Sequence, residues 1–201
     1  MTTTNNHLDG VDRTKLAEFA EYATENPDAI QFGLSAHADY EGICAHSLAG
    51  VDAYELGEER IDRDTRRYTI PYGGWKEVLD TAGWVGATDR PEPIEVALSA
   101  LAACINVGIT VNAVANGVDI DELETSVRTD FDPAVLFSLA DLKDSESVFE
   151  NVEATVAVTG DDVDPDVIDE WARRAPVYTL LSLAQDIDLT VQPVEAIAAD
   201  D

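Results

Sequence analysis

A stretch of sixteen residues without a charged side chain, Val96 to Val111, limits what this chain can fold into. It reads VALSALAACINVGITV and lies in a segment with the boundary signals of one long helix. Pro93 is acceptable in the first turn of a helix, Glu95 complements the positive end of the helix dipole, and Asn116-Gly117 is a common terminator. An amphipathic surface helix would show a polar face, and this segment shows none. We therefore expect a helix from Pro93 to about Ala115 that is covered on nearly all sides.

Such a helix needs two covering layers, because one small sheet hides only one face. We therefore expect two copies of the chain to pack their long helices together as a homodimer. The apolar run is shorter than the ~18 residues of a membrane span, so no membrane segment is predicted. The N-terminus lacks the basic start and the apolar stretch of a signal peptide, which favours a cytoplasmic location.

The remaining patterns predict an α+β fold in a single domain. Asp12 caps a helix from Arg13 to Thr24, and residues 1–10 are expected to be a loose start. Alternation or β-branched composition predicts two or three strands between Ile30 and Ile70, and strands at Leu123–Thr129, Asn151–Thr159 and Ile187–Val191. Short helices are expected at Trp75–Ala82, from Pro165 to about Arg174, and at Pro176–Leu183. The predicted organisation is an extension with one helix (1–30), the main domain (31–195) and an acidic tail (196–201).

The charge is strongly and evenly negative. The chain has 41 Asp and Glu against 12 Lys and Arg, a net charge of −29, while 45% of its residues are hydrophobic. A folded protein with an acidic surface is expected rather than a disordered chain, and this surface disfavours nucleic-acid binding. The composition resembles that of cytoplasmic proteins from salt-accumulating archaea, so we expect the fold to depend on salt that screens self-repulsion.

The two cysteines, Cys44 and Cys104, form no disulfide framework and no CxxC motif. Cys44 and His46 would share a face on a strand, but zinc needs about four ligands and no second cluster is offered. The Asp run at 161, 162, 164 and 166 lacks the calcium-loop glycine and is better explained by helix capping. No metal or other cofactor is expected.

Cys104 has two interpretations on its residues alone. A free cysteine in an apolar helix is commonly an inert, buried thiol. A reactive thiolate would need a cation from another segment, and the candidates are Arg60, Arg63, Arg66 and Arg67.

Two motifs carry a family resemblance. Residues Pro93–Cys104 read PIEVALSALAAC, a proline and an acidic residue followed by a small-apolar helix that ends in Ala-Cys, and residues Ala175–Leu180 read APVYTL. With Gly117-Val118-Asp119-Ile120 leading from the helix to a strand, these segments resemble the OsmC/Ohr superfamily over roughly residues 34–192. The resemblance implies an intertwined α+β homodimer with long helices packed between two sheets.

The resemblance also implies a chemistry. Active members reduce organic hydroperoxides with a peroxidatic and a resolving cysteine, and Cys104 matches the peroxidatic one. The resolving position holds Ala175, so an external thiol or Cys44 would have to resolve the oxidised Cys104. Glu95 matches the acidic residue of the OsmC-like branch, whereas the Ohr branch carries its glutamate where Ile94 stands. Nine residues separate Glu95 from Cys104, so Glu95 would serve a Cys104 site across a dimer.

Three functions remain open from the sequence. The first is thiol-dependent reduction of small organic hydroperoxides by Cys104 and Glu95 in an oxidative stress response. The second is a redox-inactive, stress-associated protein that binds a small apolar ligand in the same fold. The third is a purely structural dimer module.

Overall fold

The computed structural model describes residues 6–51, 53–63, 68–85, 89–141, 148–183 and 187–191. The helices are α1 (Arg13–Glu25), α2 (Lys76–Ala82), α3 (Pro93–Asn116), α4 (Pro165–Arg173) and α5 (Pro176–Ser182), with a 3₁₀ turn, η1, at Pro27–Ile30. The strands are β1 (His7–Leu8), β2 (Val11–Asp12), β3 (Phe32–Gly33), β4 (Ala36–Tyr40), β5 (Ser47–Val51), β6 (Tyr54–Leu56), β7 (Glu59–Ile61), β8 (Tyr68–Tyr72), β9 (Glu122–Phe131) and β10 (Phe149–Thr159). Helices and antiparallel sheets are mixed in one chain, which confirms the predicted α+β class.

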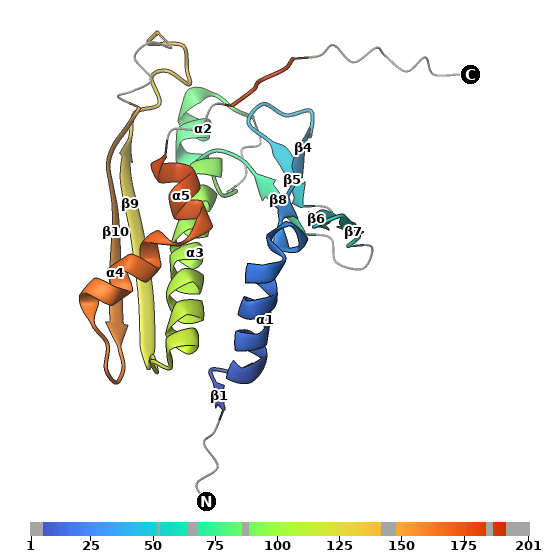
Figure 1. Ribbon diagram of the computed structural model, residues 1–201. Helices are drawn as coiled ribbons and strands as arrows, with labels where there is room; N and C mark the ends of the chain where they lie inside the picture. The colour runs from blue at the N-terminus through green and yellow to red at the C-terminus, as the bar shows by residue number, and fades with distance from the viewer. Residues whose placement is uncertain are drawn as a thin grey trace, which may run out of the picture.

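The core forms where α3 meets α4, α5 and the long β9–β10 hairpin (Figure 1). Its buried residues are Leu101, Ile105, Ile109 and Ala113 from α3, with Ile168, Trp171 and Ala175 from the α4–α5 region. The inward side chains of β9 alternate with exposed ones along the whole strand, as the sequence pattern predicts for a half-buried strand. A hydrogen bond from the Thr125 hydroxyl to Asn106 Oδ1 (2.6 Å) ties β9 to α3 and satisfies a polar group beside the apolar core.

The start and end of α3 follow from local chemistry. Glu92 Oε2 accepts from the backbone N–H of Ile94 (2.6 Å), and Glu95 Oε2 accepts from the backbone N–H of Glu92 (2.9 Å). This reciprocal capping box satisfies N–H groups that have no partner within the helix. Partial burial raises the pKa of Glu92. Gly117 ends the helix with a φ of +77°, a left-handed conformation that glycine adopts without strain.

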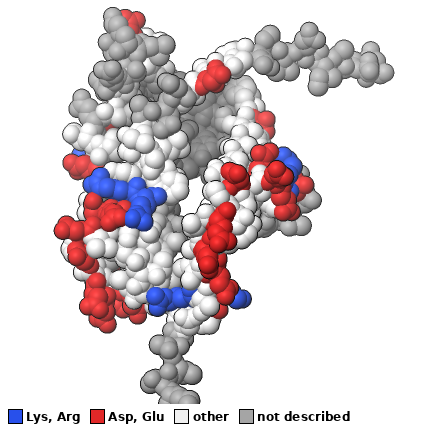
Figure 2. Space-filling model, viewed as in Figure 1, with Lys and Arg blue, Asp and Glu red and all other residues white. Residues whose placement is uncertain are grey.

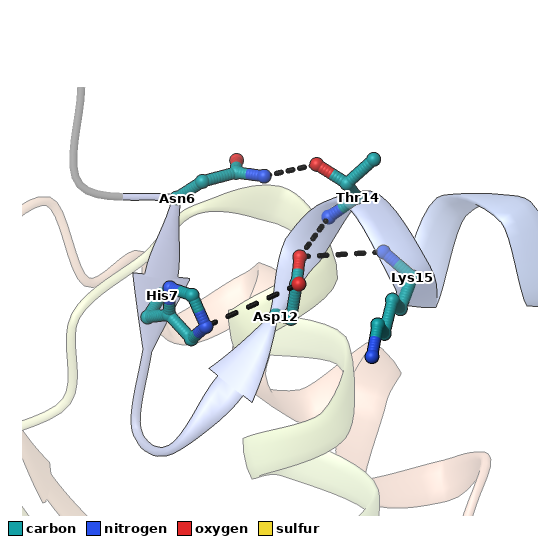
Figure 3. Close-up of polar contacts among 5 residues, drawn as sticks. All are labelled: Asn6, His7, Asp12, Thr14 and Lys15. Atoms are coloured by element: carbon teal, nitrogen blue, oxygen red, sulfur yellow. Dashed lines mark hydrogen bonds and ion pairs between the residues drawn. The ribbon is translucent and has the colours of Figure 1, made fainter. Parts of the chain in front are cut away.

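The N-terminal residues are more ordered than expected. Residues 1–10 were expected to be a loose start, but His7–Asp12 form a small hairpin, β1–β2, whose turn residues Asp9 and Gly10 have φ angles of +48° and +80°. Asp-Gly with two positive φ values is the preferred two-residue hairpin turn, which explains the difference. Asp12 then accepts from the backbone N–H groups of Thr14 (3.0 Å) and Lys15 (3.4 Å), which confirms it as the cap of α1 (Figure 3).

The region between Ile30 and Ile70 holds more and shorter strands than the two or three predicted. The described residues form two three-stranded antiparallel sheets, with strand orders β3-β6-β7 and β4-β5-β8. Glycines end these strands early: Gly42 and Gly57 lie in turns with φ angles of +82° and +58°. Gly50 has a different role, because the His37 ring on the neighbouring strand occupies the space that a Cβ at this position would need.

One face of α3 is open in the single chain. Ala100, Ala103, Val107 and Val111 form an exposed apolar stripe, and Val107 and Val111 are 58% and 53% exposed. The expectation of cover on nearly all sides is therefore not met within one chain. By length and composition alone α3 could also cross a membrane, with a mean hydropathy of 1.9. However, its opposite face forms the core described above, as in the central helix of a globular fold.

The predicted closing strand is not formed. Residues 187–191 are irregular, although their sequence alternates as Ile-Asp-Leu-Thr-Val. The apolar side chains Ile187, Leu189 and Val191 are 85%, 81% and 85% exposed. A strand exists only with a hydrogen-bonded neighbour, and the described part of the chain places none beside this segment.

Candidate functional site

Cys104 lies midway along α3 and is half-buried. The backbone N–H of Val177, at the start of α5, donates to its Sγ at 3.4 Å. This contact joins residues 73 positions apart in the chain. The structure therefore brings together the two segments that carry the family resemblance.

Ala175 is fully buried beside the same turn of α3. Gly108, one helical turn beyond Cys104, is its close neighbour: a Cβ built at Gly108 would lie 3.4 Å from Ala175 Cβ and 3.1 Å from the Trp171 carbonyl oxygen. A side chain at this position would crowd the Trp171 carbonyl, so glycine allows α4 and α5 to approach α3 closely. The methyl group of Ala175 therefore packs against α3 one helical turn from Cys104.

Glu95 and Cys104 are not brought together within one chain. The Glu95 carboxylate is engaged at the first turn of α3, where it accepts from Glu92. Nine residues of helix separate it from Cys104, a rise of about 13 Å. A contact between these two side chains would need a second copy of the chain.

The predicted arginines are engaged elsewhere or lie outside the described residues. Arg60 Nε pairs with Asp62 Oδ1 at 3.1 Å, and the Arg63 guanidinium lies over the rings of Tyr54 and Tyr68 at 5.0 and 5.7 Å. Both contacts are made in the β6–β8 region. Arg66 and Arg67 belong to a segment outside the described residues.

The sequence interpretation did not consider a cation at the junction of α4 and α5. Arg173, the last residue of α4, donates to Asp169 from Nε (2.7 Å) and Nη2 (3.0 Å), and to the Tyr178 hydroxyl oxygen from Nη1 (2.7 Å). Tyr178 follows Val177, whose N–H binds Cys104 Sγ. The hydrogen bond with Asp169 raises the pKa of Arg173 and lowers that of Asp169. The i,i+4 spacing of Asp169 and Arg173 predicts the ion pair from sequence, whereas the contact of Arg173 with Tyr178 depends on the packing of α5.

Two grooves adjoin at this ion pair. One, of about 890 Å³, lies between α4 and the β9–β10 hairpin and includes Ile105, Ile168 and Asp169 in its lining. The other, of about 580 Å³, lies between α3, α5 and β10 and is lined mainly by aliphatic and aromatic side chains. Arg173 and Tyr178 line both grooves. In Figure 2 the basic side chains over α4 border a broad uncharged surface on one side and acidic side chains on the other.

Cys44 and His46 do not form the pair that the sequence suggested. Both lie in the turn region between β4 and β5 rather than on a strand; Cys44 is exposed and His46 is buried. The Cys44 carbonyl oxygen accepts from Trp84 Nε1 at 3.1 Å, which holds the turn in place. Among the described residues no group of three or more His, Cys, Asp or Glu is placed to hold a metal ion. The Asp164 side chain accepts from the backbone N–H of Asp166 at 3.0 Å, which confirms helix capping by the aspartate run.

Comparisons with known proteins agree with the two motifs. A sequence model described as OsmC-like protein matches residues 86–191. Similar solved structures include an OsmC-like protein from Mycoplasma pneumoniae, with 15% identity and a TM-score of 0.48, covering 76% of this chain and 87% of that one. The organic hydroperoxide resistance protein OhrB of Bacillus subtilis shows 14% identity and a TM-score of 0.40, covering 73% and 88%. No curated protein matches the chain significantly.

The family match includes both segments that meet at Cys104, and it covers more than half of the chain. It begins at residue 86, before α3, and ends at residue 191. The N-terminal hairpin, α1 and the two three-stranded sheets lie outside it. The chain belongs to the OsmC-like protein family.

Proposed function

We propose that the protein reduces small organic hydroperoxides, with Cys104 as the reacting thiol. The observation that carries the proposal is the hydrogen bond from Val177 N–H to Cys104 Sγ at 3.4 Å, which links the two family motifs. The similarity to a hydroperoxide resistance protein supports this reaction class. Membership of the OsmC-like family alone would not support a reaction class, because one fold serves many functions.

The reaction has two stages. The Cys104 thiolate attacks the peroxide O–O bond, the alcohol leaves after taking up a proton, and Cys104 becomes a sulfenic acid. Ala175 cannot resolve this product, so an external thiol condenses with it to give a mixed disulfide and water. A second thiol then releases Cys104 as the free thiol and leaves with the first as a disulfide. Cys44 is an alternative resolving group in the proposal.

The working unit is a homodimer in the cytoplasm. The exposed stripe Ala100, Ala103, Val107 and Val111 is uncharged and small enough at its first two positions for two helices to approach closely. In the dimer Glu95 acts on the Cys104 site across the interface. No nucleic acid, membrane, metal or other cofactor takes part in the proposal.

The test is consumption of cumene hydroperoxide with dithiothreitol as the reductant, in molar KCl. We expect turnover by the wild type, loss of turnover in Cys104→Ser, and turnover close to wild type in Cys44→Ser when dithiothreitol is in excess. Loss of turnover only in Cys44→Ser would show that Cys44, and not Cys104, is the reacting thiol.

A redox-inactive binding protein is the alternative, and the buried Ala175 in the resolving position favours it. In that case no hydroperoxide is consumed, and Cys104 reacts with iodoacetamide only after the protein is unfolded in urea. Alkylation of Cys104 in the folded Cys44→Ser variant, confirmed by mass spectrometry, would exclude the inert thiol.

A further inference from the structure

The groove between α3, α5 and β10 has mainly apolar walls. They are built by Ile94, Leu98 and Leu101 from α3, Phe149 and Val152 from β10, and Leu181 from α5. The only charged side chain among its described lining residues is that of Arg173. This is unusual in a chain with 41 acidic residues against 12 basic ones.

A bulge in β10 creates this wall. The pairing register with β9 shifts between Glu150 and Glu153, and Asn151 has a φ of +53°. In a regular strand residues 149 and 152 would point to opposite faces, whereas the bulge lets Phe149, Val152 and Ala154 line the same groove. The side chains of Phe149 and Val152 remain exposed in the single chain.

The two ends of the groove differ. At one end the Phe149 ring stacks on Phe131 with a centroid distance of 5.4 Å, and Phe131 packs against Trp75 at 6.1 Å. At the other end lie Ala154, Tyr178 and Arg173, which this groove shares with its neighbour. From Phe149 to Ala154 the strand spans about 17 Å. The groove therefore suits an extended molecule with an apolar tail and one polar head.

The polar end has hydrogen-bonding capacity for the head. Asp169 and Tyr178 take three of the five guanidinium N–H groups of Arg173, and Asp169 is not among the residues that line this groove. Tyr178 Oη accepts from Arg173, which leaves its own O–H to donate. An Arg N–H and a Tyr O–H side by side match the two oxygens of a carboxylate.

We propose that this groove binds a medium-chain monocarboxylate, with its head at Arg173 and Tyr178 and its tail toward Phe149. Arg173 and Tyr178 are then the residues that select the head, and the apolar walls select the tail. Binding places the ligand beside the α5 turn that holds Cys104. The described lining residues of the groove do not include Cys104, so this inference goes beyond the proposed function, and binding itself needs no reactive thiol.

The groove lies on a different side of α3 from the exposed stripe. At about 100° per residue, the groove positions 94, 98 and 101 and the stripe positions 100, 103 and 107 are centred more than 100° apart around the helix. A dimer that packs only these stripes together would leave the groove open to a small molecule.

The test is calorimetric titration of the Cys104→Ser protein in molar KCl with octanoate and with octan-1-ol. We expect octanoate to bind at least tenfold more tightly than the alcohol. Arg173→Gln is expected to remove the preference for octanoate without weakening the binding of octan-1-ol. Tyr178→Phe is expected to reduce the preference severalfold. Arg174→Gln is the matched control, because Arg174 pairs with Glu170 and is not among the groove residues described.

Several outcomes would overturn the inference. Equal affinities for octanoate and octan-1-ol would show that Arg173 and Tyr178 do not recognise the carboxylate. An equal loss of the octanoate preference in Arg174→Gln would show that the preference comes from net charge alone. Binding only after the dimer is dissociated would show that a second copy occupies the groove. Circular dichroism checks that Arg173→Gln is folded. Arg173→Lys keeps the positive charge and serves as a second variant if Arg173→Gln does not fold. Because the titration uses a protein without the Cys104 thiol, its result is independent of hydroperoxide turnover.

Discussion

At the scale of single residues, the site depends on what stands beside Cys104. One backbone N–H contacts its sulfur, and the buried Ala175 packs one helical turn further along α3. The position that the family resemblance matches to a resolving cysteine therefore holds a methyl group. Oxidation of Cys104 would end in a sulfenic acid that no neighbour on α5 can reduce.

We predict that Ala175→Cys restores an internal disulfide. The introduced thiol would lie within reach of Cys104, since Ala175 packs one helical turn from it and Val177 contacts its sulfur. Exposure of the Cys44→Ser, Ala175→Cys protein to one equivalent of cumene hydroperoxide should give an intramolecular disulfide, a loss of two mass units relative to the reduced form. The Cys44→Ser protein with Ala175 intact should instead gain oxygen at Cys104. A mixed population of sulfenic acid and free thiol in the double variant would contradict the geometry.

A pair of substitutions separates the two roles of Glu95. Glu95→Gln keeps an oxygen that can accept from the Glu92 N–H, so the free energy of unfolding should stay close to wild type, whereas Glu95→Ala should lose about 1 kcal/mol. If Glu95 acts across the dimer, Glu95→Gln should still lower kcat/KM for cumene hydroperoxide about tenfold or more. Urea unfolding and steady-state rates measure the two effects. A Gln variant with unchanged rates would leave Glu95 as a helix cap only.

Part of the site was predictable from the sequence and part was not. Cys104 and the segment at Ala175 were identified because the motif residues are consecutive in the chain. Arg173 was missed, since its position beside Tyr178 depends on how α4 turns into α5 over the surface of α3. Sequence reasoning left Arg60, Arg63, Arg66 and Arg67 open as the activating cation. Within one chain Arg60 and Arg63 contact Asp62 and Tyr54, whose positions are set by the small sheets.

At the scale of helices and strands, the elements predicted correctly are those with signals in their local sequence. The helices α1, α3, α4 and α5 lie within two residues of the predicted boundaries, because Asp12, Asp164, Pro and Gly act on the residues next to them. The strands β9 and β10 were predicted because each carries a long alternating pattern. The segment Ile187–Val191 carries the same pattern, but a strand also needs a neighbour, which local sequence does not supply.

The ion pair in α4 gives a pH-dependent prediction. The hydrogen bond from Arg173 holds the pKa of Asp169 below its ordinary value of about 4. Stabilisation from this depressed pKa is present above the unfolded value and is lost as the pH falls through the folded one. Asp169→Asn should therefore lower the urea midpoint above about pH 5, and the difference from wild type should close at lower pH. In an Arg173→Gln background the same substitution should show no such pH dependence, and a persistent dependence would assign it to another group.

At the scale of the whole molecule, the exposed stripe on α3 predicts the oligomeric state. Val107→Glu places a charge at the centre of an uncharged stripe, and two such charges would meet in a symmetric dimer. We expect a dimer for the wild type and a monomer for this variant by light scattering in molar KCl. Val85→Glu is the control, since Val85 is 96% exposed and lies outside α3. A monomeric wild type, or a dimeric Val107→Glu variant, would exclude this interface.

Salt should control stability, because a net charge of −29 repels itself. We expect the melting temperature to rise between low-salt buffer and molar KCl, with unfolding at the lowest ionic strength. Equal osmolarity of sucrose serves as the control for effects other than screening. A melting temperature that does not change with KCl would contradict this prediction.

The alternating segment at residues 187–191 and the hairpin β9–β10 have a consequence for newly synthesised chains. Both expose apolar side chains, and the described part of the chain pairs no further strand with either, so incompletely assembled chains can aggregate through them. Repulsion between the acidic side chains, which form several patches on the face shown in Figure 2, keeps such molecules apart at low salt concentration. Salt screens this repulsion and favours assembly of the dimer, but the same screening also favours aggregation. Dimer formation and aggregation of new chains therefore compete at the salt concentration that the fold requires.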